Sequence, residues 1–341
     1  MNERKIIWIG RFRGYSGFAV ASREYFLVTK QYFNNLYLAS LEVLEDADPL
    51  KQYSISLPIE DSALKIVNHL PITEPDAEVY FSVFEYDRIP DTWIDIFNRS
   101  KLIMTQSNFC KNIFSKFIDE PLKIHVIPYI LPNNFFPEGK KIRYFPENIF
   151  IFGSVFEWVA RKVPERMIQA FVEEFKINEP VRLILKTSHP EGKDIKKILR
   201  EITNDSRIIL LDQQIKDIAE FYRGLDAYIS CTAGEGFGQT LFEAMSCGIP
   251  TIGSNHSGNL DFMNNDNSFL VDVHDWSLIP NSEFRWKLPK ISSIREKMRY
   301  LFENKNSDLV RSKVKNAIKT ISTFKREEIG LKIAKLIKKI L

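Results

Sequence analysis

The chain has 341 residues, of which 44% are hydrophobic and 27% charged, and its formal net charge is +3. This length predicts two domains, and the charge is too small to argue for a nucleic-acid partner. Its three cysteines (Cys110, Cys231 and Cys247) are widely spaced, which disfavours a disulfide framework or a structural zinc site. No apolar run is long enough for a membrane span or a signal peptide, so we expect a soluble, cytoplasmic protein.

Short apolar runs alternate with longer amphipathic stretches in the first part of the chain, which predicts a parallel sheet flanked by helices. The predicted strands fall near Lys5–Ile9, Leu36–Ala39, Glu78–Ser82, Leu102–Thr105 and Lys123–Ile127. The predicted helices fall near Gly17–Gln31, Pro90–Asn98 and Ser107–Phe117. This series predicts a first domain over residues 1–135.

Proline, glycine and asparagine crowd into the stretch LPNNFFPEGKKIRYFPEN, which has little periodic signal. Such a stretch between two periodic regions predicts an interdomain linker, which we place at residues 136–147. The alternative is a long loop inside one domain.

A second series of strands and helices predicts a second domain over residues 148–322. The predicted strands fall near Asn148–Phe152, Val181–Leu185, Arg207–Leu210, Ala227–Ser230, Pro250–Ile252 and Phe269–Val271. The predicted helices fall near Val163–Phe175, Asp194–Ile202, Ile215–Tyr222 and Gly238–Ser246, and the pattern is helical only from Ile291 onward. The sequence therefore predicts an α/β protein with two doubly wound, Rossmann-like parallel-sheet domains that face each other across a cleft.

The most informative segment is Thr232–Pro250, TAGEGFGQTLFEAMSCGIP, which lies between two predicted strands. Its two carboxylates, Glu235 and Glu243, are separated by seven residues. The first lies in a glycine-rich turn and the second lies inside the helix that follows. At this spacing a sugar diphosphate can bridge the two, with one carboxylate reaching sugar hydroxyls and the other the ribose.

The beginning of this helix is suited to binding a diphosphate. Free backbone N–H groups near Phe237, Gly238 and Gln239 would point toward the ligand at the positive end of the helix dipole. Gly236 and Gly238 let the backbone approach it closely. The alternative is a glycine-rich turn with two exposed glutamates.

The pattern A-G-E-G-F-G-x-x-x-F-E-A-M-x-x-G-x-P resembles the signature of retaining glycosyltransferases of family 4, the group 1 glycosyltransferases. The resemblance implies the glycosyltransferase B fold, with the first domain on the acceptor side and the second on the nucleotide-sugar side. It also implies that Glu235 contacts the donor sugar and that Glu243 binds the ribose hydroxyls.

The segment VARKVPERMIQAF is similar to the basic stretch with which this family holds the donor diphosphate. It supplies Arg161 and Lys162, and Lys186 at the end of a predicted strand is a third candidate. Many members carry Arg where this chain has Ser154, so which two cations act together stays open. Cations are needed here because the departing diphosphate carries about two negative charges that must be stabilised. We favour Lys162 first, with Arg161 and Lys186 as contenders.

Three further segments resemble parts of the family that surround the donor. In NHSGNLDFM the resemblance assigns backbone contacts to Ser257 and Gly258. In GRFRGYSGFA it places Gly14 in a loop near the donor phosphate, and in IVNHLP it places His69 near the transferred sugar. The alternative for His69 is a structural histidine.

The segment 323–341 predicts an amphipathic C-terminal helix. Its apolar face comprises Ile329, Ile333, Leu336, Ile337 and Ile340, and its basic face comprises Lys332, Lys335, Lys338 and Lys339. The resemblance implies that this helix packs back on the first domain. The alternative is peripheral contact with the inner face of a membrane, near a lipid-linked acceptor.

These features predict a retaining, metal-independent hexosyltransferase that uses a UDP- or GDP-sugar and needs no cofactor. The expected partners are the nucleotide sugar and an acceptor that the sequence does not identify, which could be a glycan, a lipid-linked molecule or a small molecule. Glycan, polysaccharide or glycolipid synthesis is the expected process. The alternatives are a nucleotide-sugar epimerase or glycoside phosphorylase on the same fold, or a non-catalytic nucleotide-sugar-binding protein.

Overall fold

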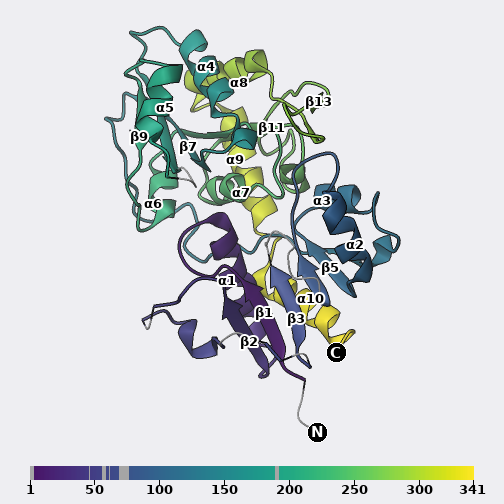
Figure 1. Cartoon of the computed structure of the whole chain (residues 1–341). Helices are drawn as coiled ribbons and strands as arrows, with labels where there is room; N and C mark the ends of the chain where they lie inside the picture. The colour runs from purple at the N-terminus through teal and green to yellow at the C-terminus, as the bar shows by residue number, and fades with distance from the viewer. Residues whose placement is uncertain (1–3, 46, 56–58, 61, 69–76, 189–191) are drawn as a thin grey trace. The chain divides into compact units, whose positions relative to one another are not determined.

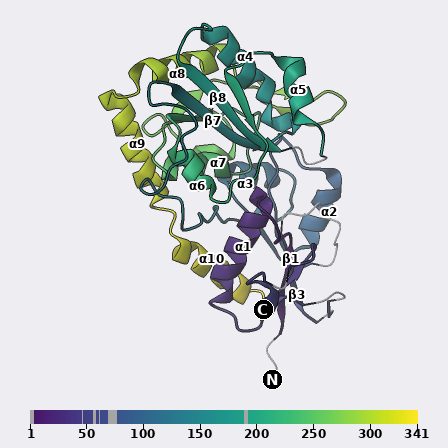
Figure 2. The same cartoon turned by 90° about the vertical axis from the view of Figure 1, so that its left-hand side faces the viewer.

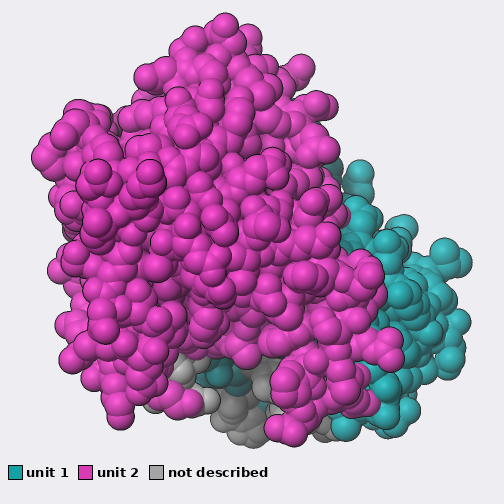
Figure 3. Space-filling view, turned by 90° about the horizontal axis from the view of Figure 1, so that it is seen from above, with its two compact units in different colours: residues 1–132, 324–341 teal, residues 133–323 magenta. Residues whose placement is uncertain are grey.

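The apolar runs of the sequence form two six-stranded sheets, each in its own unit of the chain (Figure 1). The first unit comprises residues 1–132 and 324–341, and the second comprises residues 133–323 (Figure 3). The computed structural model describes the chain except for residues 1–3, 46, 56–58, 61, 69–76 and 189–191. Each unit is doubly wound, with helices on its parallel sheet, as the sequence predicts.

The sheet of the first unit has the strand order β2-β1-β3-β4-β5-β6, and all its neighbours are parallel. Its strands are β1 (Ile6–Gly10), β2 (Leu36–Ser40), β3 (Leu64–Asn68), β4 (Val79–Phe81), β5 (Leu102–Thr105) and β6 (Ile124–Val126). Its helices are α1 (Gly17–Lys30), α2 (Asp91–Arg99), α3 (Asn108–Phe114) and α10 (Arg326–Lys338). β3, which lies in the middle of this sheet, is not among the strands predicted from the sequence.

Helix α10 packs against α1 inside the first unit (Figures 1 and 2). Gly330 makes this close approach possible, because a Cβ atom there would lie 3.0 Å from the Cβ of Val28. Ile333 and Ile337 are fully buried, and the lysines of the opposite face are exposed. The apolar face of this helix is therefore used in packing on the first unit.

The sheet of the second unit has the strand order β12-β11-β10-β7-β8-β9, again with parallel neighbours. Its strands are β7 (Phe150–Glu157), β8 (Val181–Ser188), β9 (Ile208–Leu211), β10 (Ala227–Ser230), β11 (Thr251–Ser254) and β12 (Phe269–Val271). Its helices are α4 (Pro164–Glu174), α5 (Ile195–Ile202), α6 (Ile218–Arg223), α7 (Gln239–Ser246), α8 (Ile291–Asn304) and α9 (Asp308–Ile321). A short antiparallel pair, β13 (Ser277–Leu278) and β14 (Arg285–Trp286), follows β12 and has no counterpart in the sequence analysis.

The segment 136–147, which the sequence suggests as a linker, packs within the second unit. The amide of Ile142 donates to the Glu220 carbonyl at 2.8 Å, and Arg223 donates to the Lys140 carbonyl at 2.6 Å. Gly224 leaves room for this segment, because a Cβ there would overlap the Ile142 carbonyl. Its prolines and glycines therefore mark an irregular but packed segment along α6.

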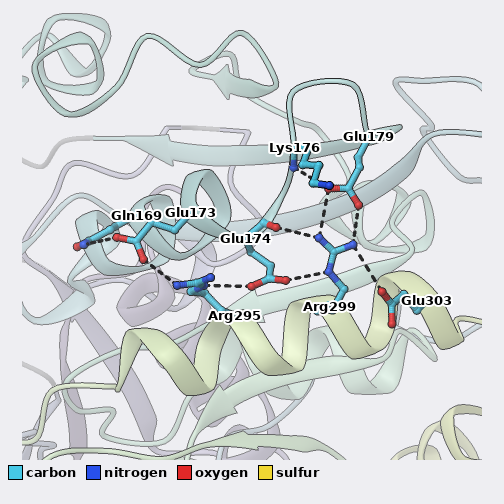
Figure 4. Close-up of polar contacts among 8 residues, drawn as sticks. All are labelled: Gln169, Glu173, Glu174, Lys176, Glu179, Arg295, Arg299 and Glu303. Atoms are coloured by element: carbon cyan, nitrogen blue, oxygen red, sulfur yellow. Dashed lines mark hydrogen bonds and ion pairs between the residues drawn. The ribbon is translucent and has the colours of Figure 1, made fainter.

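Helix α8 is held on the rest of the second unit by a network of ion pairs (Figure 4). Arg299 pairs with Glu174 at 2.8 Å and with Glu179 at 2.5 Å, and Arg295 pairs with Glu174 at 3.0 Å. The Arg299 guanidinium also lies over the ring of Phe175, 4.7 Å from its centroid. Hydrogen bonds and charge raise the pKa of Arg299, so it stays a cation at every accessible pH.

We expect Arg299→Ala to lower the free energy of unfolding by about 2 kcal/mol, because it removes a forked ion pair and aromatic packing together. Arg311→Ala is the matched control, since Arg311 pairs with an Asp308 that is 99% exposed. That change should stay within about 0.5 kcal/mol. Urea unfolding of the two variants measures both values, and equal losses would contradict the assignment of a stabilising role to Arg299.

Candidate active site

The strand order of the second unit reverses between β7 and β10, which start the two halves of the sheet. In doubly wound sheets ligands bind outside the carboxyl ends of the strands at such a switch point. β7 ends at Glu157 and β10 ends at Ser230, so the segments that follow them lie at this edge. These segments carry Arg161, Lys162 and Glu235.

A tight turn after β7 brings two cations to Glu235. The Lys162 ammonium contacts Glu235 Oε1 at 2.6 Å, and the Arg161 guanidinium contacts Glu235 Oε2 at 3.3 Å. The turn is tied to the loop after β10, because the Ala233 amide donates to the Arg161 carbonyl at 2.8 Å. Val163 ends the turn in the left-handed region at φ 38°, which is a strained conformation for a β-branched residue.

The charge of Glu235 is fixed by its surroundings. Its side chain is buried, with the residue only 6% exposed, and burial alone would raise its pKa. The positive charges of Lys162 and Arg161 outweigh that effect and hold the pKa of Glu235 below its usual value. The site therefore contains a buried carboxylate that stays ionised beside two cations.

Helix α7 begins at Gln239, after the short glycine-rich turn that carries Glu235. Gly238 precedes it at φ 96°, a conformation that favours glycine, and a Cβ atom there would lie 3.1 Å from the Cβ of Asn259. The Phe237 side chain is buried against Phe242 and Phe262, with ring centroids 5.2 and 5.0 Å away. Phe237 can thus contact a ligand only through its backbone, and its ring packs the loop against the rest of the unit.

The loop after β11 closes the other side of Glu235. The Ser257 hydroxyl accepts a hydrogen bond from the Glu235 amide at 2.8 Å, and the Gly258 amide donates to the Glu235 carbonyl at 2.9 Å. A Cβ at Gly258 would overlap the Gly236 carbonyl oxygen. Ser257 itself has φ 76° and ψ −158°, a region that is essentially reserved for glycine and costs about 1–3 kcal/mol elsewhere.

Glu243 lies inside α7 in different surroundings. It is 9% exposed, and its Oε2 atom accepts a hydrogen bond from the Tyr222 hydroxyl at 2.9 Å. Burial and the negative charge of Glu243 raise the pKa of Tyr222, so the phenol keeps its proton and remains a donor. The two glutamates therefore differ chemically, since Glu235 is balanced by cations and Glu243 is held by a neutral hydroxyl.

The structure places the remaining candidates as follows. Lys186 lies on β8 in register with Val155, and burial lowers its pKa. Ser154, buried on β7, lines a small cavity together with Lys162. Gly14 lies in the first unit at φ 83°, where its carbonyl accepts from Arg23 at 2.7 Å. His69 lies outside the described residues.

Two neighbours of the predicted residues have no recognisable sequence signal. Tyr222 reaches Glu243 from α6, and His256 precedes Ser257 with its ring edge-on to Trp276 at 5.0 Å. Burial and the charge of Lys287 lower the pKa of His256 to about 4, so the imidazole is neutral near pH 7. No spacing rule links residues on separate elements, so only the folded chain reveals these partners.

Within the described ranges, no group of three or more His, Cys, Asp or Glu side chains could hold a metal ion. None of the helices in that part of the chain combines the length and apolar content needed to cross a bilayer.

Residues 136–282 match the family model of the group 1 glycosyl transferases. The chain is 29% identical over 130 residues to N-acetyl-alpha-D-glucosaminyl L-malate synthase of Bacillus anthracis, covering 38% of this chain and 33% of that protein. It is 26% identical over 148 residues to the capsular polysaccharide biosynthesis glycosyltransferase CapM of Staphylococcus aureus, covering 42% and 38%. These alignments span little more than a third of either relative.

The fold is similar to that of HepE from Anabaena, solved in complex with UDP and glucose. The TM-score is 0.69 at 15% sequence identity, and the match covers 98% of this chain and 99% of that one. The chain therefore has the glycosyltransferase B fold that the sequence resemblance implies.

We expect Lys162→Met to lower the free energy of unfolding by about 3 kcal/mol at pH 7, because Glu235 loses a buried partner. The pKa of Glu235 is lower in the folded state than in the unfolded state. The stability that this pair contributes is therefore fully present above the unfolded-state pKa, and it is lost as the pH falls through the folded-state pKa. The difference between the variant and the wild type should therefore shrink in acid. Urea unfolding from pH 7 downward measures it.

Lys196→Met is the matched control, because Lys196 and its partner Asp212 are both more than half exposed. Its effect should be small at every pH. A Lys162→Met effect that does not change with pH would contradict the ion-pair assignment.

Proposed function

Since its residues 136–282 match the group 1 glycosyl transferases, we propose that the chain transfers a hexose-type sugar from a nucleotide diphosphate sugar to an acceptor hydroxyl. The observation that supports this most strongly is the contact of Lys162 and Arg161 with the buried Glu235 at the switch point of the sheet. This arrangement offers positive charge to a diphosphate and a carboxylate to sugar hydroxyls. The relative named for capsular polysaccharide synthesis favours a glycan acceptor.

In the proposed reaction Lys162 and Arg161 stabilise the departing diphosphate together with the N–H groups that begin α7. The diphosphate competes with Glu235 for these cations, so donor binding frees the carboxylate to accept hydrogen bonds from the sugar. Two cations and a helix terminus supply the charge, and the proposal therefore needs no metal ion. Lys186 on β8 is a further candidate for contact with the donor.

Glu243 is proposed to accept hydrogen bonds from the ribose hydroxyls. The Tyr222 hydroxyl donates to Glu243 Oε2 at 2.9 Å and so fixes the orientation of the carboxylate. An ionised carboxylate is an acceptor only, which suits it to the hydroxyls of a ribose. The backbone of Gly236, Gly238 and Gly258 is proposed to face the donor phosphates.

The transfer is proposed to retain the configuration at the sugar carbon. The bond between that carbon and the diphosphate oxygen breaks, and its electron pair stays on the diphosphate. The acceptor hydroxyl attacks from the same face and passes its proton to the leaving oxygen. Glu235 orients the sugar during this step and is not a covalent nucleophile. The HepE complex with UDP favours UDP-sugars over GDP-sugars as the first donors to test.

We expect one donor class, with UDP-sugars first, to raise the thermal unfolding midpoint of the purified chain, because a ligand that binds the folded state stabilises it. The screen compares UDP-, GDP-, ADP- and dTDP-sugars, each with and without EDTA. Lys162→Ala should reduce the shift, and both Lys162→Ala and Glu235→Ala should lower turnover roughly a hundredfold or more. Lys196→Ala, on the exposed surface of the same unit, should change neither.

Full turnover in both Lys162→Ala and Glu235→Ala would contradict the assigned roles. An isomeric sugar formed without any acceptor would indicate an epimerase, and a requirement for free phosphate would indicate a phosphorylase. Donor binding without turnover on a broad acceptor panel would indicate a non-catalytic binding protein. A donor shift abolished by EDTA would contradict metal independence.

A further inference from the structure

Ser257 occupies a backbone conformation that suits glycine, at φ 76° and ψ −158°, yet the residue there is serine. We propose that Ser257 is a positioning residue whose hydroxyl fixes the peptide of Glu235, so that the Glu235 carboxylate is aimed at the donor sugar. The inference rests on the proposed function, because it assigns the purpose of the hydroxyl to that reaction. It gives Ser257 a role through Glu235 in place of direct contact with the donor.

The hydrogen bonds of Ser257 explain why a glycine would not serve equally well. Its Oγ atom accepts from the Glu235 amide at 2.8 Å and donates to the His256 carbonyl at 2.5 Å. The bond to the His256 carbonyl therefore orients the hydroxyl, and its oxygen then accepts the hydrogen bond from the Glu235 amide. Glycine would relieve the backbone strain but would leave the buried Glu235 amide without this acceptor.

Glu235 is held at three points, and Ser257 supplies one of them. Its carbonyl accepts from the Gly258 amide at 2.9 Å, and its carboxylate contacts Lys162 at 2.6 Å. When the donor diphosphate takes the cations, the carboxylate loses its ion pairs and keeps the hydrogen bond with the Thr232 side chain. The peptide contacts from Ser257 and Gly258 then remain to set where the side chain starts and which way it points.

The strained loop is anchored on both sides of Ser257. Before it, the His256 ring meets the Trp276 ring at 5.0 Å and 89°, and Lys287 lies over Trp276 at 5.4 Å. After it, the Asn259 side-chain amide donates to the Ser254 carbonyl at 2.8 Å. These contacts keep the loop from relaxing into an ordinary conformation, which is how strain persists at functional sites.

The test compares Ser257→Gly with the wild type, using UDP-glucose and UDP-N-acetylglucosamine as donors. UDP release is followed with water as the acceptor, so that the sugar–phosphate bond breaks, water adds to the sugar and UDP leaves. We expect the unfolding midpoint of Ser257→Gly to stay the same or rise, because strain is removed. We expect kcat to fall about tenfold to a hundredfold with a smaller change in KM, because the carboxylate is misplaced while the diphosphate contacts remain.

Ser293→Gly is the matched control. Ser293 is also a buried serine, and its hydroxyl accepts a hydrogen bond from the Asp272 amide at 3.1 Å. Unlike Ser257, it lies within a helix, α8. Glycine there should lower the unfolding midpoint by a few degrees and leave kcat unchanged. Ser257→Ala should lower both values, since it keeps the strain and lacks the hydroxyl.

If the wild type is active and Ser257→Gly is equally active, this inference is wrong, while the proposed function still stands. A variant whose midpoint falls as far as that of Ser293→Gly would also overturn it, because the serine would then be structural. If the wild type showed no midpoint shift with UDP-, GDP-, ADP- or dTDP-sugars and released no nucleotide from any of them, the proposed function would be wrong and this inference would fall with it.

Discussion

The buried carboxylate of Glu235 is the constraint on which the arrangement of the second unit depends. A carboxylate at this depth is stable as an anion only beside compensating charge, and Lys162 and Arg161 provide it at 2.6 and 3.3 Å. To reach it, the chain makes a tight turn after β7 that forces Val163 into the left-handed region. The loops after β10 and β11 are then fastened to the same carboxylate residue through Ala233 and Ser257.

The strain at Val163 and Ser257 is tolerated because the rest of the unit is firmly packed. Its core gathers aromatic side chains of β7 and α4, and α8 is joined to them through Arg299, which both pairs with Glu174 and covers Phe175. The same core extends to the carboxyl edge of the sheet, where Phe156 lines a small cavity together with Lys162. The charged groups at that edge are therefore supported by firmly packed side chains, which holds them in place for a ligand.

Strands and helices with a strong local sequence pattern were predicted, and those with a weak pattern were not. The apolar runs of β7 and β10 and the glycine-rich turn before α7 were all predicted. β3 was not, because Leu64–Asn68 is short and interrupted by Lys65, although its neighbours bury it in the centre of a sheet. The prediction favoured Lys162 first and left Arg161 and Lys186 as contenders for its partner. The structure brings Lys162 and Arg161 to Glu235, while Lys186 lies on β8.

The sequence by itself determined the two doubly wound sheets, the helix that follows Glu235, and the chemical types gathered around it. It could do so because the hydrophobic periodicity, the glycine-rich turns and the spacing of the two glutamates are all patterns within short stretches of the sequence. Only the tertiary structure decided that Tyr222 holds Glu243, and that Ser257 accepts the strain of a glycine position to hold Glu235. Those contacts join residues on separate strands and helices. Which residues meet depends on the order of the strands in the sheet, because this order decides which loops lie side by side at its carboxyl edge.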